Sequence, residues 1–154
     1  MTFRAYDRAH TQRRKSTTDQ NDAVIKEFHD NNGRVGGYFS GANLVLLTTT
    51  GAKSGEKRIA PVMSFTKNGA VYVIASKAGA DTNPAWYHNM LANPSLSVEL
   101  ATDSGADAFE ATALPLPEPE RSELYAEIGA KNPGFAAYQE QTSRLIPIVE
   151  LRRA

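Results

Sequence analysis

The sequence contains no cysteine among its 154 residues. Disulfide bonds, thiol catalysis and thiolate metal sites are therefore excluded, and the absence suits a cytosolic protein. The formal net charge is zero, so the basic excess typical of broad nucleic-acid binding is missing. No apolar run approaches the roughly 18 residues that a membrane-spanning helix requires. With 41% apolar residues, the chain is expected to be a soluble domain with a buried core.

The N-terminal segment is basic and lacks the apolar stretch of a secretory signal. Its composition favours a solvated, flexible tail over residues 1–17, followed by one domain over residues 18–154. Charge attraction alone would give at most weak peripheral membrane contact. We expect a cytoplasmic protein, touching at most the inner face of the cell membrane through this tail. The cations of the tail are Arg4, Arg8, Arg13, Arg14 and Lys15.

Alternating apolar and β-branched residues predict strands over much of the chain after residue 42. The pair Asn68-Gly69 is the strongest short hairpin signal. Pro61 cannot donate to a sheet ladder, so we expect it at an edge or a bulge. The expected strands are 43–50, 57–67, 70–76, 95–101, 107–116 and 145–152.

Helical spacing of apolar residues separates these strands. Asn83 is expected to cap a helix that has Pro84 in its first position. The expected helices are 18–32, 81–94, 117–132 and 135–144. About six strands in hairpins and three or four helices, without a βαβ rhythm, indicate an α+β, mainly β fold. We expect an antiparallel sheet curled into a barrel with flanking helices.

The segment TTTGAKSGEKR, residues 48–58, resembles a phosphate-binding P-loop but does not match its pattern. In a P-loop the lysine directly follows a glycine and a helix begins at once. Here Lys53 follows Ala52, and a strand is expected next. A nucleophile elbow is excluded too, because Ser54 lies in a β-hairpin connection and not before a helix.

A less specific anion site remains possible in this segment. Gly51 and Gly55 allow backbone N–H groups to converge into a nest. From these residues alone, a phosphate or polycarboxylate site and a solvated turn are equally good interpretations. The side chains that would serve such a site are Lys53, Ser54, Arg58 and, from the neighbouring hairpin, Lys77.

His10, His29 and His88 show no ligand spacing, so no metal site is expected.

The remaining candidate site residues are aromatic. Trp86 and Met90 share one face of the helix over 81–94, which ordinarily means core packing. A planar ligand between this helix and a second aromatic group would use the same side chains. That second group consists of Tyr125, Phe135 and Tyr138.

Three stretches of the sequence carry a distinctive combination of motifs, T-T-G-x-K-S-G, A-S-K-x-G and N-P-x-W-Y. The stretches are LVLLTTTGAKSGEKRIAPVMS, YVIASKAGADTNPAWYHNMLANPSLSVEL and PGFAAYQEQTSRLIPIVEL. Together they resemble the deazaflavin-dependent nitroreductase family of actinobacteria, reductases that use reduced coenzyme F420. The similarity covers about residues 40–152.

The resemblance implies a split antiparallel β-barrel, related to FMN-binding barrels, with coenzyme F420 in a groove beside the sheet. It places residues of the TTTGAKSGEKR segment at the phosphate and oligoglutamate tail. It places the ASK segment along the ring and ribityl chain, and the NPAWYHN helix around the deazaflavin. The implied cofactor-binding residues are Lys53, Ser54, Gly55, Arg58, Pro61, Ala75, Ser76, Lys77, Pro84, Trp86 and Asn89.

The resemblance also implies hydride transfer from F420H2 to a small-molecule acceptor, namely a quinone, an activated enone or a nitroaromatic compound. Tyr138 and Phe135 are the implied catalytic residues. Nitro-reducing members carry several tyrosines in a YPSYQDY-like helix, whereas this chain has Asn132 and Phe135 at two of those positions. Two alternatives stay open: a non-catalytic F420- or flavin-binding barrel, and an FMN-dependent oxidase of the same fold.

Overall fold

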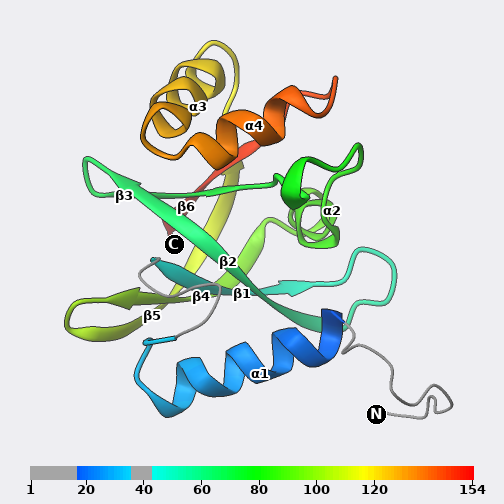
Figure 1. Ribbon diagram of the computed structural model, residues 1–154. Coiled ribbons are helices and arrows are strands. Elements are labelled where there is room, and N and C mark those ends of the chain that lie inside the picture. Colours follow the sequence, from blue (N-terminus) through cyan, green and yellow to red (C-terminus); the bar gives the residue numbers. More distant parts are fainter. Residues whose placement is uncertain (1–16, 36–42) are drawn as a thin grey trace, which may run out of the picture.

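The computed structural model describes residues 17–35 and 43–154, and within them six strands form one closed antiparallel barrel (Figure 1). The strand order around the barrel is β1-β2-β3-β6-β5-β4. Every neighbouring pair is antiparallel, which confirms the expected fold class. The strands are β1 (Leu44–Thr50), β2 (Lys57–Lys67), β3 (Ala70–Ile74), β4 (Ser95–Thr102), β5 (Gly105–Pro115) and β6 (Ile148–Arg153).

The helices lie on the outside of the barrel. In Figure 1, α3 and α4 cover one end, α1 crosses the opposite side, and α2 lies between α4 and the β1–β2 connection. Within the described residues, none of these helices is both long and apolar enough to cross a lipid bilayer. The helices are α1 (Thr17–Asp30), α2 (Ala85–Ala92), α3 (Glu120–Lys131), α4 (Pro133–Glu140) and the short 3-10 helix η2 (Lys77–Gly79).

Two hairpins follow directly from their turn residues. Asn68 and Gly69 have φ values of 53° and 83°, as a two-residue turn between β2 and β3 requires. In the second hairpin Thr102 pairs with Gly105, so Asp103 and Ser104 alone connect β4 and β5. Both hairpins were predicted from the sequence, and the structure confirms them.

Pro61 is accommodated by the way β2 changes partners. β2 pairs with β1 over residues 57–63 and with β3 over residues 64–67. Pro61 faces Leu46 of β1 in the half of β2 that has no β3 partner. The prediction of an edge strand is wrong for β2 as a whole, because the barrel is closed. Locally, however, a missing N–H at Pro61 leaves no ladder bond unmade on the β3 side.

The core consists of the barrel interior and two apolar layers beneath helices. Val45, Leu47, Val73 and Val98 meet inside the barrel, as alternate positions of a strand do. Phe28 of α1 is fully buried against the barrel wall, which contributes about 1.5–3 kcal/mol by the usual transfer estimate. The layer beneath α3 and α4 is formed by Ile74, Leu124, Tyr125, Ile128, Phe135, Ile146 and Ile148.

Some element boundaries differ from the prediction. β3 ends at Ile74, earlier than expected, because Ser76 adopts helical angles and Lys77 is left-handed. Pro84 occupies the N-cap position of α2, so Asn83 does not cap it as expected. The expected tail over residues 1–17 lies almost wholly outside the described residues, and that boundary stays a prediction.

Candidate functional site

A pocket of about 540 Å³ lies where α2, α4, β2 and the segment after β3 meet. It brings together six of the predicted site residues: Ser76, Lys77, Pro84, Trp86, Phe135 and Tyr138. The other residues lining it are Val62, Met63, Ile74, Ala78, Lys131, Asn132, Pro133 and Gly134. The pocket therefore has apolar and aromatic walls with two lysines at its margin, as ligand sites for planar molecules commonly have.

The aromatic wall on α4 is held in place by contacts behind it. Phe135 is 8% exposed and meets the ring of Tyr138 edge-on, with 5.6 Å between the ring centroids. It meets Phe65 in the same way at 5.3 Å. The Tyr125 hydroxyl donates to the Phe135 carbonyl oxygen at 2.6 Å. Burial raises the pKa of Tyr125, so this hydroxyl keeps the proton that it donates.

The segment after β3 has an uncommon backbone conformation where it lines the pocket. Lys77, Ala78 and Gly79 have φ values of 47°, 54° and 83°. Left-handed angles at two non-glycine residues cost energy and persist only when the surroundings enforce them. Gly79 is packed so closely that an added Cβ would lie 3.0 Å from the Tyr138 carbonyl oxygen. The Lys77 ammonium donates to the Thr82 hydroxyl at 3.2 Å.

Arg144 enforces this conformation, and the sequence analysis did not identify it. Its guanidinium donates to the carbonyl oxygens of Ala75, Ser76 and Ala80 at 2.8–3.2 Å. It also donates to the Asn83 side-chain oxygen at 2.6 Å. Its partners precede it by 61 to 69 residues and are mostly backbone atoms, so no local pattern in the sequence reveals this role.

The connection between β1 and β2 carries Lys53, Ser54 and Gly55, and it does not line the pocket. Most of its N–H groups are used inside the protein. Those of Gly51, Gly55 and Glu56 bind within the connection, and that of Ala52 donates to the Asn89 side-chain oxygen at 2.9 Å. Of the two interpretations that the sequence left open for this segment, these internal bonds favour the turn.

Three further predicted residues are buried beside the pocket and do not line it. Ala75 is 0% exposed, and Pro61 is also buried. Asn89 is 8% exposed and joins α2 to β1 by donating to the Thr49 hydroxyl at 3.1 Å. Since Asn89 also binds Ala52, it fixes the Lys53-bearing connection against the helix that carries Trp86. These three residues therefore support the elements that line the pocket and do not contact the cavity themselves.

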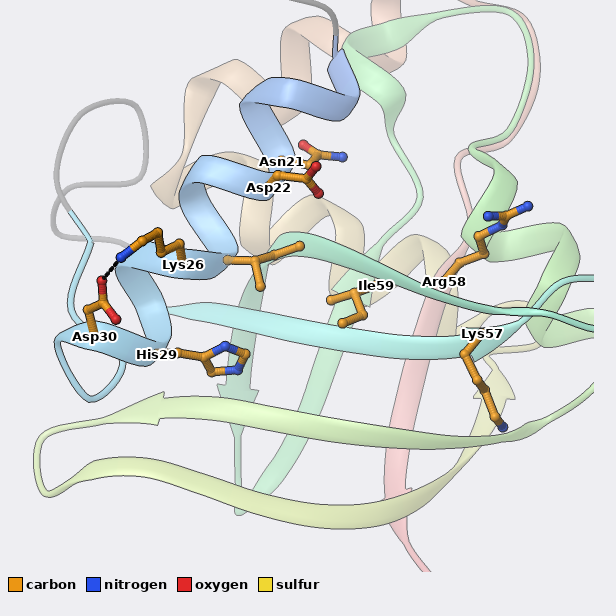
Figure 2. A pocket seen from close by; sticks show the side chains of 9 residues that line it. Asn21, Asp22, Lys26, His29, Asp30, Lys57, Arg58 and Ile59 are labelled. Carbon is orange, nitrogen blue, oxygen red and sulfur yellow. Dashed lines mark hydrogen bonds and ion pairs between the residues drawn. The ribbon is translucent and has the colours of Figure 1, made fainter. Parts of the chain in front are cut away.

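Arg58 lies elsewhere, at a groove of about 880 Å³ between α1 and β2 (Figure 2). Figure 2 shows the side chains from α1 and β2 that line this groove, and Lys26 and Asp30 pair with each other on the helix at 2.5 Å. Arg58 pairs with Glu56 at 3.3 Å. The groove is larger than the pocket, but none of the described residues that line it is Phe, Tyr or Trp. We regard the aromatic pocket as the candidate site.

Across residues 17–35 and 43–154, no three His, Cys, Asp or Glu side chains lie close enough to hold one metal ion. The only histidine with a close carboxylate in the described chain is His29, which lies 2.9 Å from Glu99 on the surface.

Comparisons with known proteins agree with the geometry. The family model described as F420H(2)-dependent quinone reductase matches residues 21–152. The chain is 35% identical over 131 residues to the F420H(2)-dependent quinone reductase Rv1261c of Mycobacterium tuberculosis, covering 82% of this chain and 85% of that protein.

Two solved structures share both fold and sequence with this chain. One is described as an F420-H2 dependent reductase (FDR-A), with 41% identity, a TM-score of 0.60, and coverage of 71% of this chain and 93% of that one. Another, described as a domain-swapped dimer, has 36% identity and a TM-score of 0.63 over 89% of this chain and all of that one. A closed barrel, an aromatic pocket and a family match over most of its length show that this chain belongs to the F420H2-dependent quinone reductase family.

Proposed function

We propose that the pocket between α2 and α4 binds the deazaflavin ring of coenzyme F420 and presents it to a quinone. The observation that carries this proposal is the pocket itself, a cavity of about 540 Å³ that Trp86 of α2 and Phe135 and Tyr138 of α4 line together. When bound, the reduced coenzyme supplies a hydride from C5 of its ring. The protein supplies binding, orientation and electrostatics.

The residues present fit such a coenzyme. A planar ring suits the apolar side chains of Met63, Ile74 and Trp86. Among the described residues, no protein acceptor is recorded for the N–H groups of Ser76 and Lys77, which line the pocket. These donors are available for the polar edge of a deazaflavin. The pocket therefore offers both an apolar surface and hydrogen-bond donors, as a flavin-like ring requires.

The anionic part of the coenzyme would be bound outside the pocket. Lys53 is exposed and has no carboxylate partner in the described chain, so its charge is available to a phosphate. Arg58 can bind a phosphate or carboxylate with two parallel hydrogen bonds. Asn89 of α2 binds the β1–β2 connection that carries Lys53. One helix would therefore position both the residues that contact the coenzyme's phosphate and those that contact its ring. Ser54 and Gly55 complete the turn that presents Lys53.

The acceptor would bind against α4. Phe135 packs against an acceptor ring, and the Tyr138 hydroxyl is the candidate proton donor or orienting group. Asn132, which also lines the pocket, already donates to the Ile128 carbonyl oxygen at 3.0 Å. Quinones are the proposed acceptors because the family is described by that activity. Activated enones and nitroaromatic compounds are further candidates, and the loss of tyrosines at Asn132 and Phe135 makes bicyclic nitro compounds the weakest of them.

An assay with enzymatically reduced F420 tests the proposal. A menaquinone analogue, an enone and a nitroaromatic compound are each added, and coenzyme oxidation is followed by its absorbance. We expect turnover with the quinone. Tight binding of reduced F420 without oxidation by any acceptor would favour the non-catalytic alternative. Binding of FMN and of F420 is compared by the quenching of Trp86 fluorescence. A higher affinity for FMN than for F420 would favour the FMN-dependent oxidase.

A further inference from the structure

The contacts of Arg144 have a consequence for the peptide groups that line the pocket. Its Nη1 donates to the Ala75 carbonyl oxygen at 3.2 Å, and its Nη2 donates to that of Ser76 at 2.9 Å. Nε donates to Ala80 at 2.8 Å and Nη1 to the Asn83 side chain at 2.6 Å. A guanidinium offers five donors in a fixed planar fork, so these four acceptors are held in one arrangement.

Arg144 is itself fixed to α4. The Gln139 side-chain amide donates to the Arg144 carbonyl oxygen at 2.7 Å. The oxygen of the same Gln139 side chain accepts from the Ile146 N–H at 3.0 Å. Gly79 packs against the end of α4, with space for no side chain. The segment after β3 and the helix that carries Phe135 are therefore held together as one unit.

The carbonyl contacts also determine where two N–H groups point. The peptide bonds after Ala75 and Ser76 are trans, so each N–H points opposite to the preceding carbonyl. Because both carbonyls point at Arg144, the N–H groups of Ser76 and Lys77 point away from it. Ser76 and Lys77 line the pocket, whereas Arg144 does not. In the described chain, neither N–H has a recorded protein acceptor.

We propose that Arg144 is a positioning residue for the coenzyme. By holding the carbonyls of Ala75 and Ser76, it directs the N–H groups of Ser76 and Lys77 into the pocket, where they donate to a carbonyl or anionic nitrogen at the polar edge of the ring. Paired backbone donors fixed before binding stabilise negative charge on a ligand without reorganising. This inference rests on the proposed function, because it takes the occupant of the pocket to be a deazaflavin.

Amide hydrogen exchange of the unaltered protein tests the orientation directly. Exchange at Ser76 and Lys77 is measured by NMR with and without saturating oxidised F420. We expect exchange at both amides to slow by about tenfold or more when the coenzyme binds, as for amides that acquire an acceptor. Protection elsewhere in the pocket, with none at these two amides, would overturn the inference and leave the proposed function standing. Absence of any binding would overturn both.

Substitutions then test the part played by Arg144. The variants are Arg144→Lys and Arg144→Gln, with Arg152→Gln as the control. Arg152 is on β6, and its side chain is 64% exposed and pairs with Glu150. Each is titrated with F420 and with a deazaflavin that lacks the phosphate and glutamates. We expect Arg144→Lys to weaken both ligands by the same factor, about tenfold, and Arg144→Gln to weaken both further.

The two ligands separate positioning of the ring from other effects. Lys53→Ala should weaken only the complete coenzyme, because the shorter ligand has no phosphate. Unchanged affinity of Arg144→Lys for the ring-only ligand would overturn the role of Arg144. A third variant, Arg144→Ala, leaves space for a free guanidinium ion, which at millimolar concentration should restore ring binding. If Arg144→Ala melts cooperatively and ring binding does not recover, the role of Arg144 is also overturned. Arg152→Gln should bind both ligands as the unaltered protein does.

Discussion

At the scale of single residues, the site separates charge from aromatic surface. Lys53 and Arg58 lie outside the pocket, on or beside the β1–β2 connection. Trp86, Phe135 and Tyr138 form the pocket walls. A coenzyme with a ring at one end and anions at the other would use the two groups independently. Substitutions of Lys53 or Arg58 should therefore weaken coenzyme binding, whereas substitutions of Phe135 or Tyr138, on the acceptor side, should lower turnover.

Lys53→Ala tests the charged group. We expect coenzyme binding to weaken by about 1–3 kcal/mol, the contribution of a hydrogen bond to a charged group. The measurement is a fluorescence titration with F420. Lys67→Ala is the matched control, because Lys67 is on the surface and pairs with Glu127 at 2.7 Å, far from the connection that carries Lys53. Unchanged affinity in Lys53→Ala would place the phosphate elsewhere.

Tyr138→Phe tests the acceptor side of the aromatic group. Removing the hydroxyl keeps the edge-on contact with Phe135, so the wall stays intact. We expect turnover with the quinone to fall about tenfold, since an orienting or donating hydrogen bond is lost, while F420 affinity is unchanged. Tyr87→Phe serves as the control, because Tyr87 lies on α2 but does not line the pocket. An unaffected turnover number would identify solvent as the proton source.

At the scale of elements, the decisive contact joins η2 to α4. Gly79 and Gly69 have the same φ of 83°, so alanine is strained equally at both positions. They differ in space: a Cβ at Gly79 would lie 2.9 Å from the Gln141 side-chain oxygen, whereas Gly69 has nothing within 4 Å. Alanine substitutions at these two glycines therefore distinguish the effect of backbone strain from the effect of losing the contact between η2 and α4.

We expect Gly69→Ala to lower the free energy of unfolding by about 1 kcal/mol without changing F420 affinity. Gly79→Ala should lower the free energy of unfolding further, because η2 must move away from α4. It should also weaken coenzyme binding. Urea unfolding and an F420 titration measure the two effects. Equal losses of stability in both variants, with equal F420 affinity, would show that the η2–α4 contact does not shape the site.

The same distinction explains what the sequence could predict. Asn68-Gly69 specifies its hairpin locally, through residues that tolerate positive φ, and the prediction is confirmed. The early end of β3 depends on Arg144, whose carbonyl partners lie more than 60 residues before it. The choice between a nest and a turn in the β1–β2 connection depends on bonds of its N–H groups to Asn89 and within the connection, which no local pattern shows. Local signals predicted elements, whereas the shape of the site depends on contacts between distant segments.

At the scale of the whole molecule, the barrel is a rigid support for a site built on its surface. Each strand pairs with two neighbours around the ring, and the barrel interior is filled by apolar side chains. The pocket, in contrast, is lined by residues of α2, α4 and η2 together with residues of β2 and β3. A ligand that joins these elements binds the folded protein alone, so its binding free energy adds to the stability of the fold.

Thermal unfolding therefore reports which cofactor the fold prefers. At a free F420 concentration 100 times its Kd, the folded state gains about 2.7 kcal/mol. For a domain of this size we expect the Tm to rise by about 5–10 °C. FMN has a phosphate but no oligoglutamate tail, so at the same concentration it should raise the Tm less. Lys53→Ala, with binding weaker by about 1–3 kcal/mol, should lose between about a third and nine-tenths of the F420 shift while keeping its own Tm without ligand. A shift with FMN equal to or greater than that with F420 would replace the deazaflavin with a flavin as the occupant of this pocket.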